Sequence, residues 1–208
     1  MTTTLRAGLS TLLILGCLLI GGVGLYLVAT GFTFVAPTVQ LNALPLAVRV
    51  HVLSGSIALL LVPWQVLPRV RRHHRLHRWI GRGYVVAAVI AGSSGLLAAF
   101  GTANGAVAGA GFALAAVLWT WSSLAAATAA RGRRIRAHQV WAIRSLALCL
   151  AAVTLRVYLG AAQGFGIPLD FAYPAVAWLS WVPNLLIAQW WVSTTRSRAR
   201  QSNAAVAR

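Results

Sequence analysis

Long apolar stretches separated by short polar stretches dominate the hydrophobic pattern of the chain. Six of them reach the length of about 20 residues that an α-helix needs to cross the hydrocarbon core of a bilayer. They cover residues 8–30, 47–68, 83–103, 107–129, 144–163 and 174–194. Glycine, proline and asparagine, which commonly end helices, gather in the breaks. The pattern predicts an all-α fold, a polytopic membrane bundle of six transmembrane helices.

The same pattern suggests a simple domain organisation. We expect one transmembrane domain over residues 1–195 and a basic, disordered cytoplasmic tail over residues 196–208. The first apolar stretch continues to Thr30, which is too long for the core of a cleaved signal peptide, so we interpret it as a retained span. Cys17 and Cys149 lie far apart inside apolar stretches, and we interpret both as small buried residues.

The charged residues predict the orientation of the bundle. They make up 9% of the 208 residues, and they comprise eighteen arginines and one acid, Asp170. A six-span arrangement puts sixteen arginines on one side, mostly in residues 69–82 and 131–144 and after the last span. Because short basic loops stay in the cytoplasm, we predict that both termini and both arginine-rich loops are cytoplasmic. The alanine-rich, lysine-free composition is typical of a GC-rich bacterial genome and favours a multi-pass protein of the plasma (inner) membrane.

The formal net charge of +17 raises the question of nucleic-acid binding. The arginines form short clusters between apolar stretches and no separate basic domain, so we expect no nucleic acid as a partner. The expected partner is a bilayer with anionic headgroups. No predicted span contains Asp or Glu, and the chain has no P-loop, no H-E-x-x-H and no G-x-S-x-G. These absences argue against a conventional hydrolase or ATPase, and whether the chain is an enzyme stays open.

Two histidines occupy matching positions on two predicted helices that run in the same direction. His77 lies five residues before Arg82, and His138 lies six before Arg144, so both imidazoles have nearly the same depth. Axial ligation of a haem b requires one imidazole from each side of the iron. Arg82 and Arg144 are the candidate contacts for its propionates. The alternative interpretation is that both histidines lie among lipid headgroups; zinc binding by His73, His74 and His77 would lack a completing Cys or acid.

Arg156 and His51 form a second constellation, near the outer ends of their predicted helices. An arginine about 10 Å from the end of a span costs a few kcal/mol unless it is paired or hydrated. Arg156 would then pair with Asp170 or with backbone carbonyl groups at a helix end. The functional alternative is a ligand-binding site in which Arg156 and His51 hold a haem propionate, a quinone oxygen or a lipid phosphate.

Two stretches carry a family resemblance. One runs from His51-Val-Leu-Ser-Gly55 to His77-Arg-Trp-Ile-Gly-Arg82, and the other from His138-Gln-Val-Trp-Ala-Ile-Arg144 to Arg156. Together with Trp178, Trp181 and Asn184, they resemble the bacterial membrane family catalogued as domain of unknown function twenty-three-oh-six, over roughly residues 47–192. The resemblance implies a small polytopic protein and no particular activity. The chain departs from the family pattern at Ala142, where Met is expected, and at Gln189, where an acid is common.

Two weaker similarities accompany this one. Aligned from Arg69 and Arg131, the two basic loops share four arginines and one tryptophan, which suggests a duplicated helical hairpin. Ascorbate-reducible cytochromes b also have six spans, with histidines on the four central ones. This chain has Trp119 and Trp121 but no histidine on the fourth span, so the similarity implies one haem site at most.

Three functional hypotheses remain open. The first is a haem b redox protein that exchanges electrons with a quinone or a metal ion. The second is a transporter or lipid-binding protein that uses Arg156 and His51. The third is an accessory subunit of a membrane complex, or a homo-oligomer, which would dock through small-residue faces. These faces are Ala125, Ala126 and Ala129, and Gly105, Ala108 and Gly109.

Overall fold

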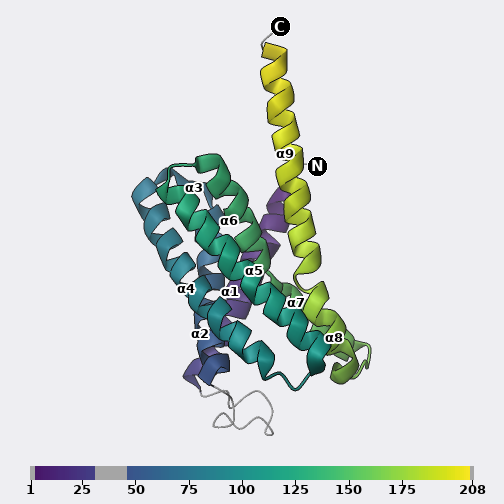
Figure 1. The fold of residues 1–208 in the computed structure, drawn as a ribbon. Helices are drawn as coiled ribbons and strands as arrows, with labels where there is room; N and C mark the ends of the chain where they lie inside the picture. The colour runs from purple at the N-terminus through teal and green to yellow at the C-terminus, as the bar shows by residue number, and fades with distance from the viewer. Residues whose placement is uncertain (1–2, 31–45, 207–208) are drawn as a thin grey trace.

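The computed structural model describes residues 3–30 and 46–206, which form helices and short connections without strands. Helix α1 spans Thr3–Ala29, α2 Leu46–Val66, α3 Pro68–Arg72, α4 His74–Phe100, α5 Gly105–Arg131, α6 Ile135–Cys149, α7 Ala151–Gly164, α8 Leu169–Leu179 and α9 Val182–Val206. Along the bundle α1 packs on α2, α2 on α4, α4 on α5 and α5 on both α6 and α8, while α7 packs on α8 and α6 on α9 (Figure 1). The all-α prediction is confirmed.

Six segments of the described chain are long and apolar enough to cross a membrane. They are Ser10–Ala29, Leu46–Val66, His74–Phe100, Gly105–Arg131, Ile135–Gly164 and Leu169–Thr195. The six-span prediction is therefore confirmed, although the third and fifth helices each begin nine residues earlier than predicted. The first residues of both helices are polar and basic, so the apolar stretch begins later than the helix does. Basic side chains at a membrane interface still have good helix propensity.

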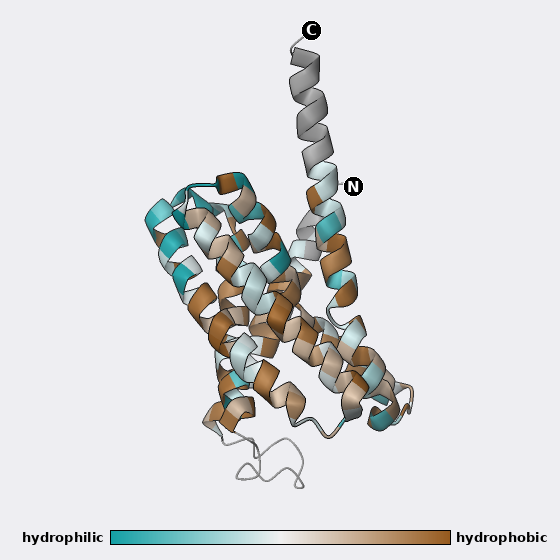
Figure 2. Cartoon of the chain, in the orientation of Figure 1, coloured by the Kyte–Doolittle hydropathy of each residue, from teal (hydrophilic) through white to brown (hydrophobic). Residues whose placement is uncertain are grey.

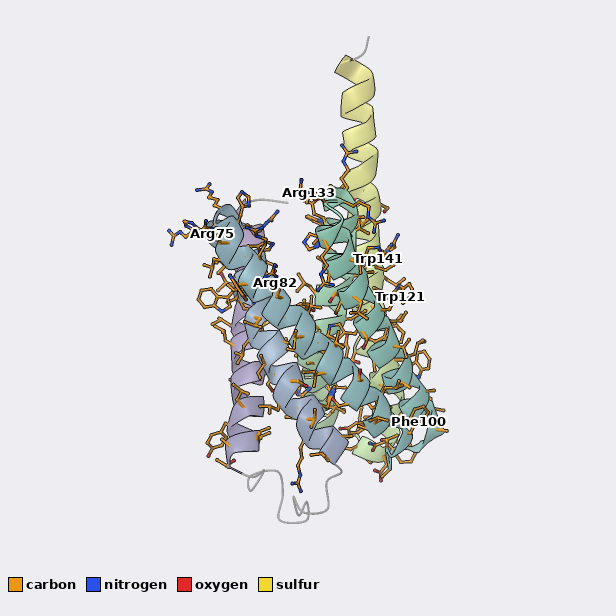
Figure 3. The ribbon with its side chains drawn as sticks, turned by 60° about the vertical axis from the view of Figure 1, so that its left-hand side comes forward. Arg75, Arg82, Phe100, Trp121, Arg133 and Trp141 are labelled. Carbon is orange, nitrogen blue, oxygen red and sulfur yellow. The ribbon has the colours of Figure 1, made fainter. Side chains whose placement is uncertain are left out.

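Both arginine-rich segments lie at one end of the bundle. Helix α3, the start of α4 and the start of α6 all lie there, and the N-terminal part of α1 and the C-terminal part of α9 lie at the same end (Figure 1). Polar residues gather at this arginine-rich end, and apolar residues predominate in the middle of the bundle (Figure 2). Figure 3 shows Arg75 and Arg133 at this end and Phe100 at the opposite end. The two basic segments therefore lie on the same side of the bundle, and their cytoplasmic location remains a prediction.

Two of the six segments are interrupted near their middle. The fifth segment changes from α6 to α7 at Leu150, and the sixth changes from α8 to α9 at Ser180 and Trp181. Pro183 causes the second break, because a proline has no amide hydrogen and its ring clashes with the preceding turn. The amide nitrogen of Asn184 donates to the carbonyl oxygen of Ala147 at 3.3 Å and to that of Ser180 at 3.1 Å. This side chain therefore joins the two interrupted segments.

The core consists mainly of small residues, with one buried polar cluster in the centre. The hydroxyls of Tyr84 on α4 and Ser145 on α6 are 2.8 Å apart, and Ser123 on α5 lies 2.8 Å from Ser145. The indole nitrogen of Trp119 donates to the Tyr84 hydroxyl at 3.2 Å. Cys17 and Cys149 are free thiols buried in the same core, as predicted. Helices can approach closely here because their contact faces carry Gly, Ala and Ser.

Two expectations from the sequence differ from the structure. Helix α9 continues to Val206, where the sequence predicted a disordered tail; after Pro183 this segment contains neither glycine nor proline to end the helix. The small-residue faces expected to dock a partner lie largely inside the chain. Ala108, Ala126 and Ala129 are buried, and a Cβ at Gly109 would lie 3.0 Å from the carbonyl oxygen of Ala99. Those faces pack neighbouring helices of the same chain.

Candidate functional site

The two predicted imidazoles lie at the arginine-rich end, one turn inside α4 and α6. The Nδ1 atom of His138 lies 2.9 Å from the carbonyl oxygen of Ala126 on α5. Because a carbonyl oxygen can only accept, Nδ1 carries the proton and donates, and the lone pair of a neutral ring then lies on Nε2. Histidines that bind metals are usually oriented in this way by a hydrogen bond from the other ring nitrogen.

His77 brings an unsatisfied polar group to the same end. Its ring interacts electrostatically with that of His138, so the structure brings the two rings near each other. The His77 Nδ1 atom is buried and has no hydrogen-bond partner, and the same holds for Nε2 of Gln65 on α2. Gly81, one turn after His77 on the same face of α4, lies against the Gln65 amide, since a Cβ there would be 3.4 Å from Oε1.

These orphaned atoms are informative because buried polar groups in proteins are normally hydrogen-bonded. Leaving a donor or acceptor without a partner costs about 1–3 kcal/mol. His77, His138 and Gln65 therefore form the candidate site, which we call the inner imidazole site. Gln65 is not among the site residues predicted from the sequence. The sequence did contain a signal for Gln65, since a glutamine inside an apolar span is unusual. The close approach of Gly81 to the Gln65 amide is visible only in the structure.

The two candidate propionate contacts face other side chains in the structure. The Arg82 guanidinium carbon lies 5.1 Å from the centroid of the Trp79 ring, and that of Arg144 lies 4.5 Å from the Trp141 ring. Arg144 also donates to Oε1 of Gln189 from Nε at 3.2 Å and from Nη2 at 2.7 Å. The matching Trp-x-x-Arg contacts agree with the sequence echo between the two basic segments.

His51 is anchored at the opposite half of the bundle. Its Nδ1 atom lies 2.8 Å from the carbonyl oxygen of Ala91 on α4, so Nδ1 donates and Nε2 is left with its lone pair. The ring packs on Gly95, where a Cβ would lie 2.6 Å from Nδ1, so any larger residue would displace the imidazole. His51 is therefore held in one orientation by α4.

Arg156 on α7 interacts electrostatically with His51, so the structure brings these two predicted residues together. The Arg156 Nη1 atom donates to the carbonyl oxygen of Ala152, one turn earlier in the same helix, at 3.1 Å. In the described residues Arg156 forms no ion pair with Asp170, and both side chains are exposed. Of the two structural interpretations considered above, backbone bonding is the one observed. We call His51 and Arg156 the outer arginine site.

The remaining histidines do not add a metal centre. His73 and His74 are exposed beside α3, as predicted for residues of a basic loop. Over residues 3–30 and 46–206, no group of three His, Cys, Asp or Glu side chains could hold a metal ion. The described residues thus bring together two of the predicted groupings, the imidazoles of His77 and His138 at one end and Arg156 with His51 at the other.

Comparison with known proteins identifies the family of this chain. The chain matches no curated protein and no solved structure. The sequence profile of a family described as "Predicted membrane protein (DUF2306)" matches residues 48–192, which cover α4 to α8 completely and most of α2. The match includes both candidate sites. The resemblance noted from the sequence is thus confirmed, and the chain belongs to the DUF2306 family of predicted membrane proteins.

Proposed function

We propose that this membrane protein binds one haem b through His77 and His138 and transfers electrons to or from a quinone or a metal ion. The observation that supports the proposal best is the hydrogen bond from His138 Nδ1 to the Ala126 carbonyl oxygen. It leaves Nε2 of His138 available as an iron ligand. His77, a second imidazole nearby on a parallel helix, would be the other iron ligand.

The unsatisfied atoms at the inner imidazole site support the same proposal. Nδ1 of His77 and Nε2 of Gln65 are buried without partners, so the site has polar capacity that the chain itself does not use. A haem with its ordered water would provide such partners. Gly81 and the alanines beside His138 leave this region with small side chains. Haem iron would alternate between its ferric and ferrous forms, which suits one-electron transfer.

The experiment is an absorption spectrum of the detergent-purified protein from cells supplied with haem. We expect a reduced-minus-oxidised spectrum of a six-coordinate haem b, with about one haem per chain. His77→Ala and His138→Ala should each lose it. His74→Ala is the matched control, because it removes an exposed histidine three residues from His77, and it should keep the spectrum. A colourless wild-type protein that elutes as a folded species would refute the proposal.

The outer arginine site supports a second candidate function, the binding or transport of an anionic or polar molecule. Arg156 has no acidic partner among the described residues, and the Nε2 atom of His51 keeps its lone pair. A guanidinium at this depth gains from an anion or a carbonyl oxygen because the surroundings are apolar. Quinone oxygens and lipid phosphates both have the required acceptors.

Binding of a short-chain benzoquinone, followed by quenching of tryptophan fluorescence, would test this second candidate. Arg156→Gln should weaken binding about tenfold or more, since it removes a charge-assisted bond. Arg196→Gln is the matched control, because it makes the same substitution at an arginine after the last apolar stretch, and it should leave binding unchanged. Equal binding by both variants would remove the quinone from consideration, and retention of phospholipid by the wild type alone would favour the lipid phosphate.

We also infer that the arginine-rich end faces the cytoplasm and that the membrane is the bacterial plasma membrane. The positive-inside rule supports the orientation, since both basic segments are short and lie at one end (Figures 1 and 2).

A further inference from the structure

A pocket at the arginine-rich end is lined by basic and aromatic side chains of one helix. Its volume is about 380 Å³, and its lining residues are Arg75, Arg78, Trp79 and Arg82 of α4. The spacing of three, four and seven residues puts all of them on one face of the helix. The pocket is separate from the inner imidazole site, because Arg82 is five residues after His77 and so points well away from it. We call it the α4 pocket.

Two of the three arginines are already oriented. The Arg82 guanidinium is stacked on Trp79, with 5.1 Å from its central carbon to the ring centroid. The Nε atom of Arg78 donates to the carbonyl oxygen of His74 at 3.2 Å, which leaves the two terminal nitrogens of its guanidinium for a ligand. Pre-organised guanidinium groups bind oxyanions well, because little side-chain freedom is lost on binding.

No acidic residue offsets the charge of the pocket. Asp170, the sole acid of the chain, lies at the start of α8, at the opposite end of the bundle (Figure 1). Three guanidinium groups within two helical turns repel one another, so an anion between them gains from all three. Arg75 and Arg82 are seven residues apart, about 10 Å along the helix, which is room for one or two phosphate groups.

The surface next to the α4 pocket indicates what kind of anion the pocket could bind. Val86 and Ile90 follow Arg82 at intervals of four residues on the same face, and 59% and 45% of their surfaces are exposed. Trp79 is 69% exposed and lies at the boundary between the basic and the apolar part. An amphiphile with a negative headgroup and an apolar chain could contact both the arginines of the pocket and the apolar side chains that follow them. A free anion would contact only the arginines.

We propose that the α4 pocket is a binding site for the phosphodiester headgroup of an anionic phospholipid, whose acyl chain lies along Val86 and Ile90. Arg75, Arg78 and Arg82 bind the phosphate oxygens, and Trp79 holds Arg82 in place. A lipid with two phosphates binds more tightly than one with a single phosphate, because both engage the same row of arginines. This proposal does not require haem, and it assigns Arg82, a candidate propionate contact in the haem hypothesis, to the lipid phosphate instead.

Native mass spectrometry of the delipidated protein tests it, with dioleoyl-phosphatidylglycerol and dioleoyl-phosphatidylcholine as probes. The wild type should retain phosphatidylglycerol and not phosphatidylcholine. The triple variant Arg75→Gln, Arg78→Gln, Arg82→Gln should bind phosphatidylglycerol about tenfold or more weakly.

The matched control is Arg133→Gln, Arg134→Gln, Arg136→Gln, which removes the same charge from the other basic segment and should retain binding. Arg82→Lys keeps the charge and loses the planar stack on Trp79, so it should weaken binding by a smaller factor and remain folded.

Equal losses in the two triple variants would overturn the proposal, because they would indicate attraction by net charge alone. Equal retention of both lipids would overturn it as well. Competition by millimolar inorganic phosphate that fully displaces phosphatidylglycerol would assign the pocket to a free anion and contradict the lipid.

Discussion

The hydroxyl oxygen of Tyr84 lies 2.8 Å from that of Ser145, and this contact joins α4 to α6 in the centre of the bundle. Trp119 donates to the same Tyr84 oxygen, and Ser123 contacts Ser145, so α5 completes the cluster. Every hydroxyl in it has a partner. A fully paired polar cluster in an apolar core favours one arrangement of helices over others, because sliding any helix leaves a buried group unpaired.

Removal of the Tyr84 hydroxyl should destabilise the bundle. Tyr84→Phe leaves the Trp119 N–H without its acceptor and Ser145 with one partner fewer, so we expect a loss of about 1–2 kcal/mol in unfolding free energy. Tyr158→Phe makes the same chemical change on a partly exposed tyrosine of α7 and should cost less than about 0.5 kcal/mol. Thermal unfolding in detergent measures both. Equal effects would mean that the cluster contributes no specific stability.

Two glycines of the bundle should respond in opposite directions to the same substitution. A Cβ at Gly92 on α4 would meet the side chain of Thr120 and would lie 3.2 Å from the carbonyl oxygen of Ala116, both on α5. Gly92→Ala should therefore destabilise by about 1–3 kcal/mol through overpacking. Gly160 on α7 has nothing within 4 Å of such a Cβ. Gly160→Ala should be neutral or stabilising by up to about 1 kcal/mol, because alanine is the better helix former. Denaturation curves of the two variants decide the matter.

The bridge across the interrupted helices should show energetic coupling. Nδ2 of Asn184 donates to Oγ1 of Thr154 at 3.2 Å, in addition to the carbonyl oxygens of Ala147 and Ser180. Asn184→Ala and Thr154→Val should each destabilise the protein, and the double variant should lose less than the sum, with a coupling of about 0.5–1.5 kcal/mol. Strict additivity in a double-mutant cycle would show that the hydrogen bond has no net value.

Introducing an acid at position 189 should strengthen a contact that already exists. Arg144 donates two hydrogen bonds to the neutral oxygen of Gln189, and Gln189→Glu turns them into charge-assisted bonds. Both side chains are partly exposed, so we expect a gain of about 0.5–1 kcal/mol and a higher Tm. Gln189→Leu should lower Tm. In an Arg144→Gln background the gain from Gln189→Glu should disappear, and its persistence there would exclude the pair as its cause.

Thiol labelling should establish the orientation of the bundle. Cys17 and Cys149 are 1% and 3% exposed, so the folded wild type should not react with a membrane-impermeant maleimide. Arg72→Cys and Arg133→Cys should be labelled from the cytoplasmic side, and Asn104→Cys from the other side. Right-side-out and everted membrane vesicles distinguish the two. Labelling of positions 72 and 133 on opposite faces would contradict the shared depth of His77 and His138.

Several features of the fold were predictable from sequence because they depend on local composition. Apolar stretches of membrane-spanning length, the arginine clusters between them and the choice of His77 and His138 all follow from residues close together in the chain. In lipid, backbone hydrogen bonds must be satisfied within each segment, so an apolar stretch of that length has to form a helix. The same reasoning placed His51 and Arg156 towards the opposite end.

Other features depended on which helix faces meet, and this requires the tertiary structure. The hydrogen bond of His138 to Ala126 and the burial of the unpaired Gln65 amide nitrogen beside Gly81 arise from packing between helices. Hydrophobicity alone cannot specify these faces, because a span surrounded by lipid is apolar on every side. Sequence thus determined the number of spans and the common side of the basic segments, whereas the side chains that share each site were decided by close packing of small residues.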